Sequence, residues 1–101
     1  MKTTKVIING GELTLTDVHV KCLLAIADNP NVGTFDKLAE ITGLDPRTAN
    51  AAVMALANMR CNGDLELMQL GMTGMYLYDN GFEAVRQITE QEETQANEAQ
   101  L

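Results

Sequence analysis

The chain has 101 residues and a formal net charge of −7, with 46% hydrophobic residues, 4% aromatic residues and no tryptophan. This length suits one domain, and the apolar fraction suffices for one small core built from aliphatic side chains and methionine. No segment approaches the roughly 18 consecutive apolar residues of a membrane-spanning helix, and the first residues lack the pattern of a secretory signal. We therefore expect a cytoplasmic protein.

The acidic charge is unevenly spread along the chain. Residues 89–101 hold four Glu and no base, whereas residues 1–88 hold ten acidic and seven basic residues. The last segment has no periodic apolar residues, which is typical of a helical extension or of a disordered tail. We therefore expect a folded domain at 1–88 and an acidic tail at 89–101.

A short hairpin and a helix are predicted at the N-terminus. Residues 4–15 place Asn9-Gly10 between two strand-like runs, and Asn-Gly is the strongest short-range hairpin signal. Thr16 then offers an N-cap hydroxyl, and apolar residues at helical spacing predict a helix that ends before Pro30. Its buried stripe is expected to hold Val20, Leu23, Leu24 and Ala27.

Two short helices joined by a tight turn are predicted within residues 34–60. Thr34 is the candidate N-cap of the first helix, and Gly43 can take the left-handed conformation that ends it. Asp45-Pro46 is a strong start signal for a second helix over 46–60. The apolar face of this second helix holds Ala49, Ala52, Val53 and Leu56, and its outward face holds Arg47, Thr48, Asn50, Ala51 and Met54.

A second hairpin and a last helix are predicted after this pair. Strand-like runs extend over residues 65–70 and 75–78, on either side of a tip at residues 71–74. Asn80 or Gly81 then opens a helix. The apolar side of that helix is expected to hold Phe82, Val85 and Ile88.

The order of these elements and two sequence runs resemble the winged-helix superfamily of bacterial and phage transcriptional regulators. LAEITGLDPRTANAAVMALANM is similar to the two-helix motif of those regulators, and LELMQLGMTGMYLYDNGFEAV is similar to their wing and the helix start that follows. The resemblance covers residues 5–88. It implies an α+β winged helix-turn-helix with a three-helix core, a two-stranded wing, an N-terminal strand or hairpin and a C-terminal helix. We also expect a homodimer that pairs through the first and last helices.

Winged-helix regulators place the second helix of the motif in the major groove and rest the wing on the DNA backbone. The resemblance therefore implies double-stranded DNA as the partner and transcriptional regulation as the role. Arg47, Thr48 and Asn50 fall at base-reading positions, and Lys37 and Arg60 are candidate phosphate contacts. Arg pairs with guanine and Asn with adenine through two hydrogen bonds each.

The charge of the motif favours an alternative, in which the winged helix binds protein. Residues 34–79 hold six acidic and three basic residues, whereas specific DNA binders commonly make about 6 to 10 phosphate contacts. Exposed apolar clusters usually mark interfaces. Met54, Met72 and Met75 are therefore candidate contacts for binding or inhibiting another nucleic-acid-handling protein.

No set of residues points to catalysis or to a metal. His19 and Cys22 lie one helical turn apart, but a metal would need further ligands and a nucleophile would need an orienting acid. Cys61 is expected on another helix as a free thiol. Gly71 and Gly74 lack the Lys and the further glycines of a phosphate loop. We expect no enzyme, no cofactor and no metal site.

Overall fold

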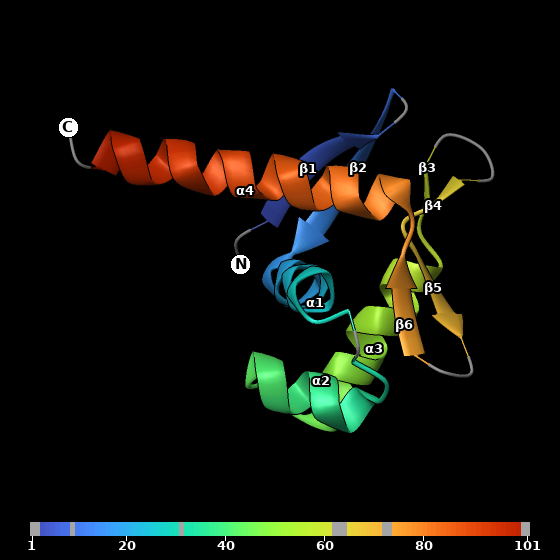
Figure 1. Cartoon of the computed structure of the whole chain (residues 1–101). Coiled ribbons are helices and arrows are strands. Elements are labelled where there is room, and N and C mark those ends of the chain that lie inside the picture. The colour runs from blue at the N-terminus through green and yellow to red at the C-terminus, as the bar shows by residue number, and fades with distance from the viewer. Residues whose placement is uncertain (1–2, 9, 31, 62–64, 72–73, 100–101) are drawn as a thin grey trace.

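The computed structural model describes the backbone of residues 3–8, 10–30, 32–61, 65–71 and 74–99, and the side chains within these ranges except at 60–61, 65–66, 70–71 and 94–99. These residues form four helices and three antiparallel strand pairs (Figure 1). In chain order the elements are β1 (Thr3–Ile8), β2 (Gly11–Thr16), α1 (Asp17–Asp28), α2 (Phe35–Thr42), α3 (Pro46–Ala57), β3 (Arg60–Cys61), β4 (Leu65–Glu66), β5 (Met68–Gly71), β6 (Gly74–Leu77) and α4 (Asp79–Ala99). The expected α+β class is confirmed.

The predicted N-terminal hairpin is present as β1 and β2. The two strands pair antiparallel from Thr3 opposite Thr16 to Ile8 opposite Gly11. Side chains alternate between the two faces of a strand, so Val6 and Ile8 are buried while Ile7 is 52% exposed. One face of this hairpin therefore belongs to the core.

Helix α1 begins at the predicted cap and lies in the middle of the molecule. The Thr16 hydroxyl accepts from the His19 N–H, and His19 Nδ1 accepts from the Thr16 N–H, both at 3.3 Å. Strand β2 and the helices α2, α3 and α4 all contact α1, so it is buried on more than one side. Its buried residues are Val20, Cys22, Leu23, Ala25 and Ile26. The predicted single stripe was wrong in this respect, since Leu24 and Ala27 are only half-buried.

The predicted pair of helices is confirmed as α2 and α3. Gly43 has a φ of 78° and ends α2 in the left-handed conformation, which glycine adopts without steric penalty. Helix α3 starts at Pro46 but ends at Ala57, so the expected extension to Arg60 was wrong. The side chain of Asn58 donates to the Met54 carbonyl at 2.7 Å, and the backbone then turns into β3.

The second hairpin is more divided than the sequence predicts. Strand β4 pairs with β3, whereas β5 pairs with β6. The single strand expected over residues 65–70 is therefore two short strands, each with a different partner strand. Leu67 lies between β4 and β5 and is fully buried, and its carbonyl accepts from the Tyr78 N–H at 2.9 Å. The chain bends at Leu67 because that side chain enters the core.

Helix α4 crosses the N-terminal hairpin, and its C-terminal part extends beyond the rest of the molecule (Figure 1). The Gln87 side chain bonds both the N–H and the carbonyl of Ile7, at 2.8 and 2.7 Å, and Gln91 donates to the Lys5 carbonyl at 2.8 Å. Two glutamines thus satisfy backbone groups on the free edge of β1, which would otherwise attract another strand.

The core is built on four helices, not on the three that were expected, because α4 contributes Ala84 and Ile88. Phe82, expected on the buried side of α4, is 54% exposed. Among the described residues, no helix is both long enough and apolar enough to cross a membrane. The other fully buried large side chains are Val6, Ile8, Leu15, Cys22, Leu23, Leu38, Val53, Leu56, Leu67 and Met68.

Candidate nucleic-acid interface

Helix α3 is fixed by one face and presents the other to solvent. Its four predicted core residues, Ala49, Ala52, Val53 and Leu56, are all buried. On the opposite side Arg47, Asn50 and Ala51 are exposed and Met54 is 46% exposed. The predicted division of this helix into a core face and an outward face is confirmed for these residues, whereas Thr48, also expected on the outward face, is half-buried.

The start of α3 carries a negative charge. The Asp45 carboxylate accepts from the Thr48 N–H at 2.9 Å and from the Thr48 hydroxyl at 2.8 Å. These hydrogen bonds, the backbone one first, hold the pKa of Asp45 below its usual value. Asp45 is therefore ionised at neutral pH, and the hydroxyl proton of Thr48 is engaged within the protein. Thr48 keeps its oxygen lone pairs as acceptors for a ligand.

The candidate phosphate contacts belong to other elements than α3. On α2, the Lys37 ammonium lies 4.0 Å from the Glu40 carboxylate, and both side chains are mostly exposed. Exposed pairs of this kind contribute about 0 to 1 kcal/mol, so a phosphate can replace Glu40. Arg60 is in β3 instead of the predicted helix, and its side chain lies outside the described residues.

The three candidate protein-contact methionines have different surroundings. Met54 is exposed on α3, as expected. The expected exposure of Met75 was wrong: it is 3% exposed, because it points from β6 into the core while the next residue, Tyr76, points outward. Met72 lies outside the described residues. Of the three, Met54 alone is described at the surface.

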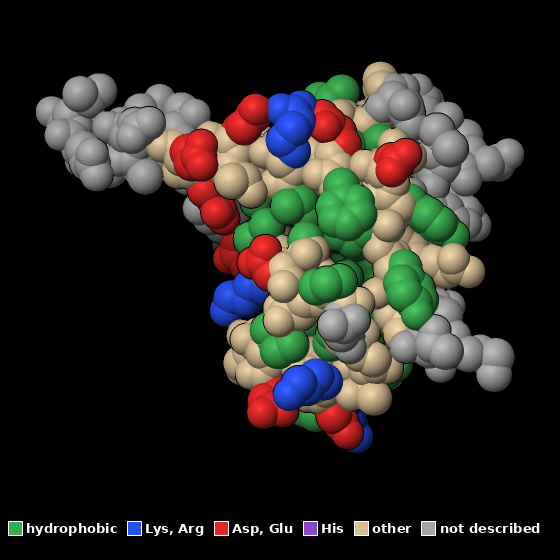
Figure 2. All heavy atoms as spheres, viewed as in Figure 1, with side chains coloured by type: hydrophobic (Ala, Val, Ile, Leu, Met, Phe, Trp, Pro, Cys, Tyr) green, Lys and Arg blue, Asp and Glu red, His purple; other side chains and the backbone are tan. Residues whose placement is uncertain are grey.

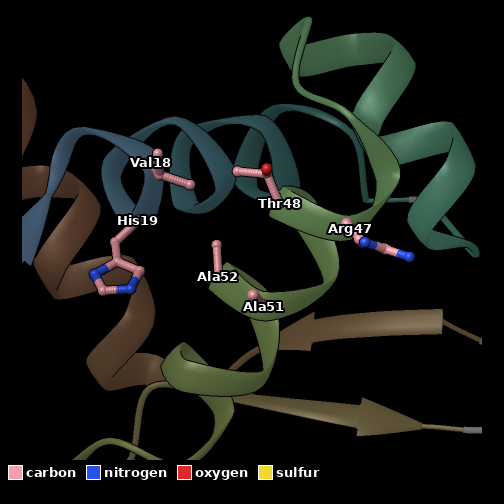
Figure 3. Close-up of a pocket in the computed structure, with 6 residues that line it drawn as sticks. All are labelled: Val18, His19, Arg47, Thr48, Ala51 and Ala52. Carbon is pink, nitrogen blue, oxygen red and sulfur yellow. The ribbon is translucent and has the colours of Figure 1, made fainter.

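A hollow of about 500 Å³ separates the start of α1 from the start of α3. Its lining residues are Val18, His19, Arg47, Thr48, Ala51 and Ala52. Figure 3 shows Arg47 at the outer edge, with its guanidinium directed away from His19. The sequence could not reveal this hollow, because nothing local indicates that two residues of α1 face the outward side of α3.

His19 and Cys22 serve the fold: His19 takes part in the N-terminal cap of α1, and Cys22 is buried in the core. Burial lowers the pKa of His19, whose Nδ1 acts as the hydrogen-bond acceptor at the cap of α1. Burial raises the pKa of Cys22, which is fully buried, so its thiol stays protonated. Among the described residues, no group of three or more His, Cys, Asp or Glu is placed to hold a metal ion.

Positive charge is scarce around this face. Within α2, the turn and α3, Lys37 and Arg47 are opposed by Asp36, Glu40 and Asp45. Acidic residues therefore outnumber basic residues in this part of the chain. No protein-family model, curated protein or solved structure matches the chain.

Proposed function

We propose that this protein is a small winged-helix regulator that places α3 in the major groove of double-stranded DNA. The observation that carries the proposal is the outward face of α3, where Arg47 and Asn50 are both exposed while the opposite face is anchored in the core. In helix-turn-helix proteins, the N-terminal residues of the second helix contact the base edges. The order β1–β2, α1, α2, α3 and β5–β6 supports the winged-helix arrangement.

The spacing of the two side chains suits the reading of neighbouring bases. Arg47 and Asn50 are three residues apart, so they share one side of α3 and are separated by about 4.5 Å along its axis. Stacked bases on one strand are about 3.4 Å apart. Arg47 is suited to guanine and Asn50 to adenine, and Thr48 can accept from a base amino group.

The small number of Lys and Arg side chains in the motif limits how strongly the affinity for DNA depends on salt. The logarithm of the affinity falls by about 0.9 per neutralised phosphate for each tenfold rise in salt. Arg47 is assigned to a base, so Lys37 and Arg60 are the candidate phosphate contacts of the motif, and one chain has an expected slope of about −2. Two chains on one site would double this slope and the number of bases that are read.

A titration of pooled genomic fragments at about 50 mM salt tests the proposal. We expect a salt-sensitive mobility shift whose affinity Arg47→Ala reduces about 5- to 150-fold, since one bidentate base contact contributes about 1 to 3 kcal/mol. Lys5→Ala is the matched control: it removes one positive charge from β1, away from α3, and leaves the shift intact. The absence of any shift, or an equal loss in both variants, would contradict DNA binding.

A second candidate function is protein binding through the same face. Met54 is 46% exposed on α3, and Ala51 on the same side of this helix is exposed and carries no charge. Methionine adapts to irregular partner surfaces. This candidate predicts that the outward face of α3 binds another nucleic-acid-handling protein without a salt-sensitive DNA shift, so the DNA titration separates the two functions.

A further inference from the structure

Three of the four aromatic side chains of this protein lie at the surface, close to the junction of β6 and α4. Tyr76 is 44% exposed, Tyr78 is 40% exposed and Phe82 is 54% exposed. The fourth aromatic residue, Phe35, packs against the core. Large apolar side chains left in water forgo the main stabilising contribution of folding, and clusters of them mark interaction sites. We refer to Tyr76, Tyr78 and Phe82 as the aromatic surface.

Strand pairing and a backbone hydrogen bond place these three residues close to one another in the fold. Tyr76 is opposite Gln69 in the β5–β6 pair, and the Tyr78 hydroxyl donates to Gln69 Oε1 at 2.9 Å, so both tyrosines lie on the outer face of this hairpin. The Phe82 N–H donates to the Tyr78 carbonyl at 3.1 Å, which places Phe82 one helical turn further on. Figure 2 shows hydrophobic side chains gathered on the face between the start of α4 and β6.

The support beneath the aromatic surface is tightly packed. A Cβ added to Gly81 would come within 2.3 Å of the Leu67 carbonyl oxygen, so α4 and the hairpin are in direct backbone contact. Leu67 itself is fully buried. The aromatic side chains therefore stand on a fixed junction, which reduces the entropy lost when a partner binds.

Acidic side chains border the aromatic surface. Asp79 directly follows Tyr78, and Glu83 directly follows Phe82. Hydrogen bonds from Arg86 lower the pKa of Glu83 to about 2, so this carboxylate is ionised. Arg86 is bound by both Glu83 and Glu90, so these three side chains together carry one net negative charge beside that of Asp79. From residue 79 to residue 93 there are five acids and one base.

We propose that the aromatic surface binds a protein segment in which apolar or aromatic anchor residues are flanked by Lys or Arg. Tyrosine and other aromatic side chains dominate binding energy at protein interfaces, and charge complementarity selects the partner. A second copy would bring Asp79 and Glu83 against acidic residues of the same kind. Nucleic acid would bring phosphates against the same carboxylates. In a protein segment of this kind, the apolar residues match the aromatic surface and the Lys or Arg residues match its acidic border.

The experiment is a selection of random peptides of about 12 residues on the full-length chain, at about 50 mM salt. The expected peptides combine aromatic or aliphatic residues with Lys or Arg. One of them, synthesised without Tyr or Trp, is then titrated while tyrosine emission is followed. The chain has two tyrosines and no tryptophan, and both tyrosines belong to the aromatic surface, so the emission reports on this site directly.

Two variants and a control define the site. Phe82→Ser weakens binding of the selected peptide at least tenfold, and Asp79→Asn weakens it about two- to fivefold because one border charge is lost. Ile7→Ser is the matched control: Ile7 is 52% exposed, and its backbone contacts α4 at Gln87, about 140° around the helix from Phe82. Ile7→Ser and Arg47→Ala leave peptide binding unchanged. Thermal melts followed by circular dichroism verify that each variant is folded.

Several outcomes would overturn the proposal. They are a selection that enriches no peptide, enriched peptides without basic residues, and binding that Phe82→Ser leaves intact. Self-association that Phe82→Ser abolishes, seen as a dependence of tyrosine emission on protein concentration, would assign the aromatic surface to a second copy instead.

Discussion

At the scale of single residues, His19 occupies a position that Glu or Gln usually fills in a capping box. Its Nδ1 accepts from the Thr16 N–H, while the Thr16 hydroxyl accepts from the His19 N–H. Only a neutral imidazole can accept, because both nitrogens of the protonated ring carry hydrogen. In sequence, Asp17 and Lys21 are the charged residues closest to His19 on α1, and Arg47 on α3 lines the same hollow.

This arrangement makes the stability of α1 depend on pH. Burial lowers the pKa of His19 in the folded chain below its ordinary value, so between the two pKa values the unfolded chain binds more protons. The free energy of unfolding is then constant above about pH 6.5 and falls as the pH drops below it. We expect a loss of up to about 1 kcal/mol, the size of one cap interaction.

Urea denaturation between pH 7.5 and 5 measures this loss. His19→Gln is the matched variant, because a glutamine carbonyl accepts the same hydrogen bond without titrating. The difference in free energy of unfolding between the two proteins isolates His19, because the two proteins share every other ionisable group. Parallel curves for the original protein and His19→Gln would show that the cap does not respond to pH.

At the scale of elements, α4 and the second hairpin approach each other closely at Gly81. A Cβ at Gly81 would lie 2.3 Å from the Leu67 carbonyl oxygen and 3.2 Å from Leu77 side-chain carbons. Alanine favours a helix over glycine by about 1 kcal/mol, whereas overpacking costs about 1 to 3 kcal/mol. The backbone carbonyl cannot rotate aside as a side chain could, so we expect overpacking to dominate.

Gly81→Ala should therefore lower the free energy of unfolding by up to about 2 kcal/mol, which is the overpacking cost less the gain in helix propensity. The measurement is urea denaturation at pH 7. Thr89→Ala is the control, because Thr89 is exposed on the same helix and the change raises helix propensity without a new contact. If both variants were stabilised, the close approach of α4 to Leu67 would be wrong.

Local signals explain which elements the sequence could predict. Thr16, Thr34 and Asp45 each cap a helix by bonding a backbone N–H three residues on, and Gly43 ends α2 by its own conformation. None of these needs a distant partner. The exposed positions of Arg47 and Asn50 also follow from periodicity, because they are opposite the apolar face of α3.

Tertiary packing explains what the sequence could not predict. Met75 and Tyr76 are both apolar enough for a core, and the position of α1 against β6 decides that Met75 is buried. Phe82 fits an apolar stripe, but Ala84 and Ile88 are the residues of α4 that enter the core. The hydrogen bond from the Thr48 hydroxyl to the Asp45 carboxylate depends on the rotamer of Asp45, which the sequence does not specify. The sequence therefore predicted which residues of the candidate site are exposed on α3. It did not predict their hydrogen bonds or the hollow beside them.

At the scale of the whole molecule, net charge opposes the proposed binding of DNA. The charge is −7, and residues 92–101 hold three Glu and no base. In Figure 1 the end of α4 projects away from the body, so its charge acts through the solvent. The Debye length is about 10 Å at 0.1 M salt, and the repulsion of DNA by this segment is therefore strong only at low salt.

Removal of residues 92–101 should tighten DNA binding about two- to tenfold at about 50 mM salt, with little effect at about 0.5 M. The truncation keeps Gln91, which donates to the Lys5 carbonyl, so the free energy of unfolding should stay unchanged. Fluorescence anisotropy with labelled DNA measures the affinity. A full-length variant with Glu92, Glu93 and Glu98 changed to Gln separates charge from chain length: equal tightening in both proteins assigns the effect to charge, whereas unchanged affinity in both would contradict an electrostatic role for this segment.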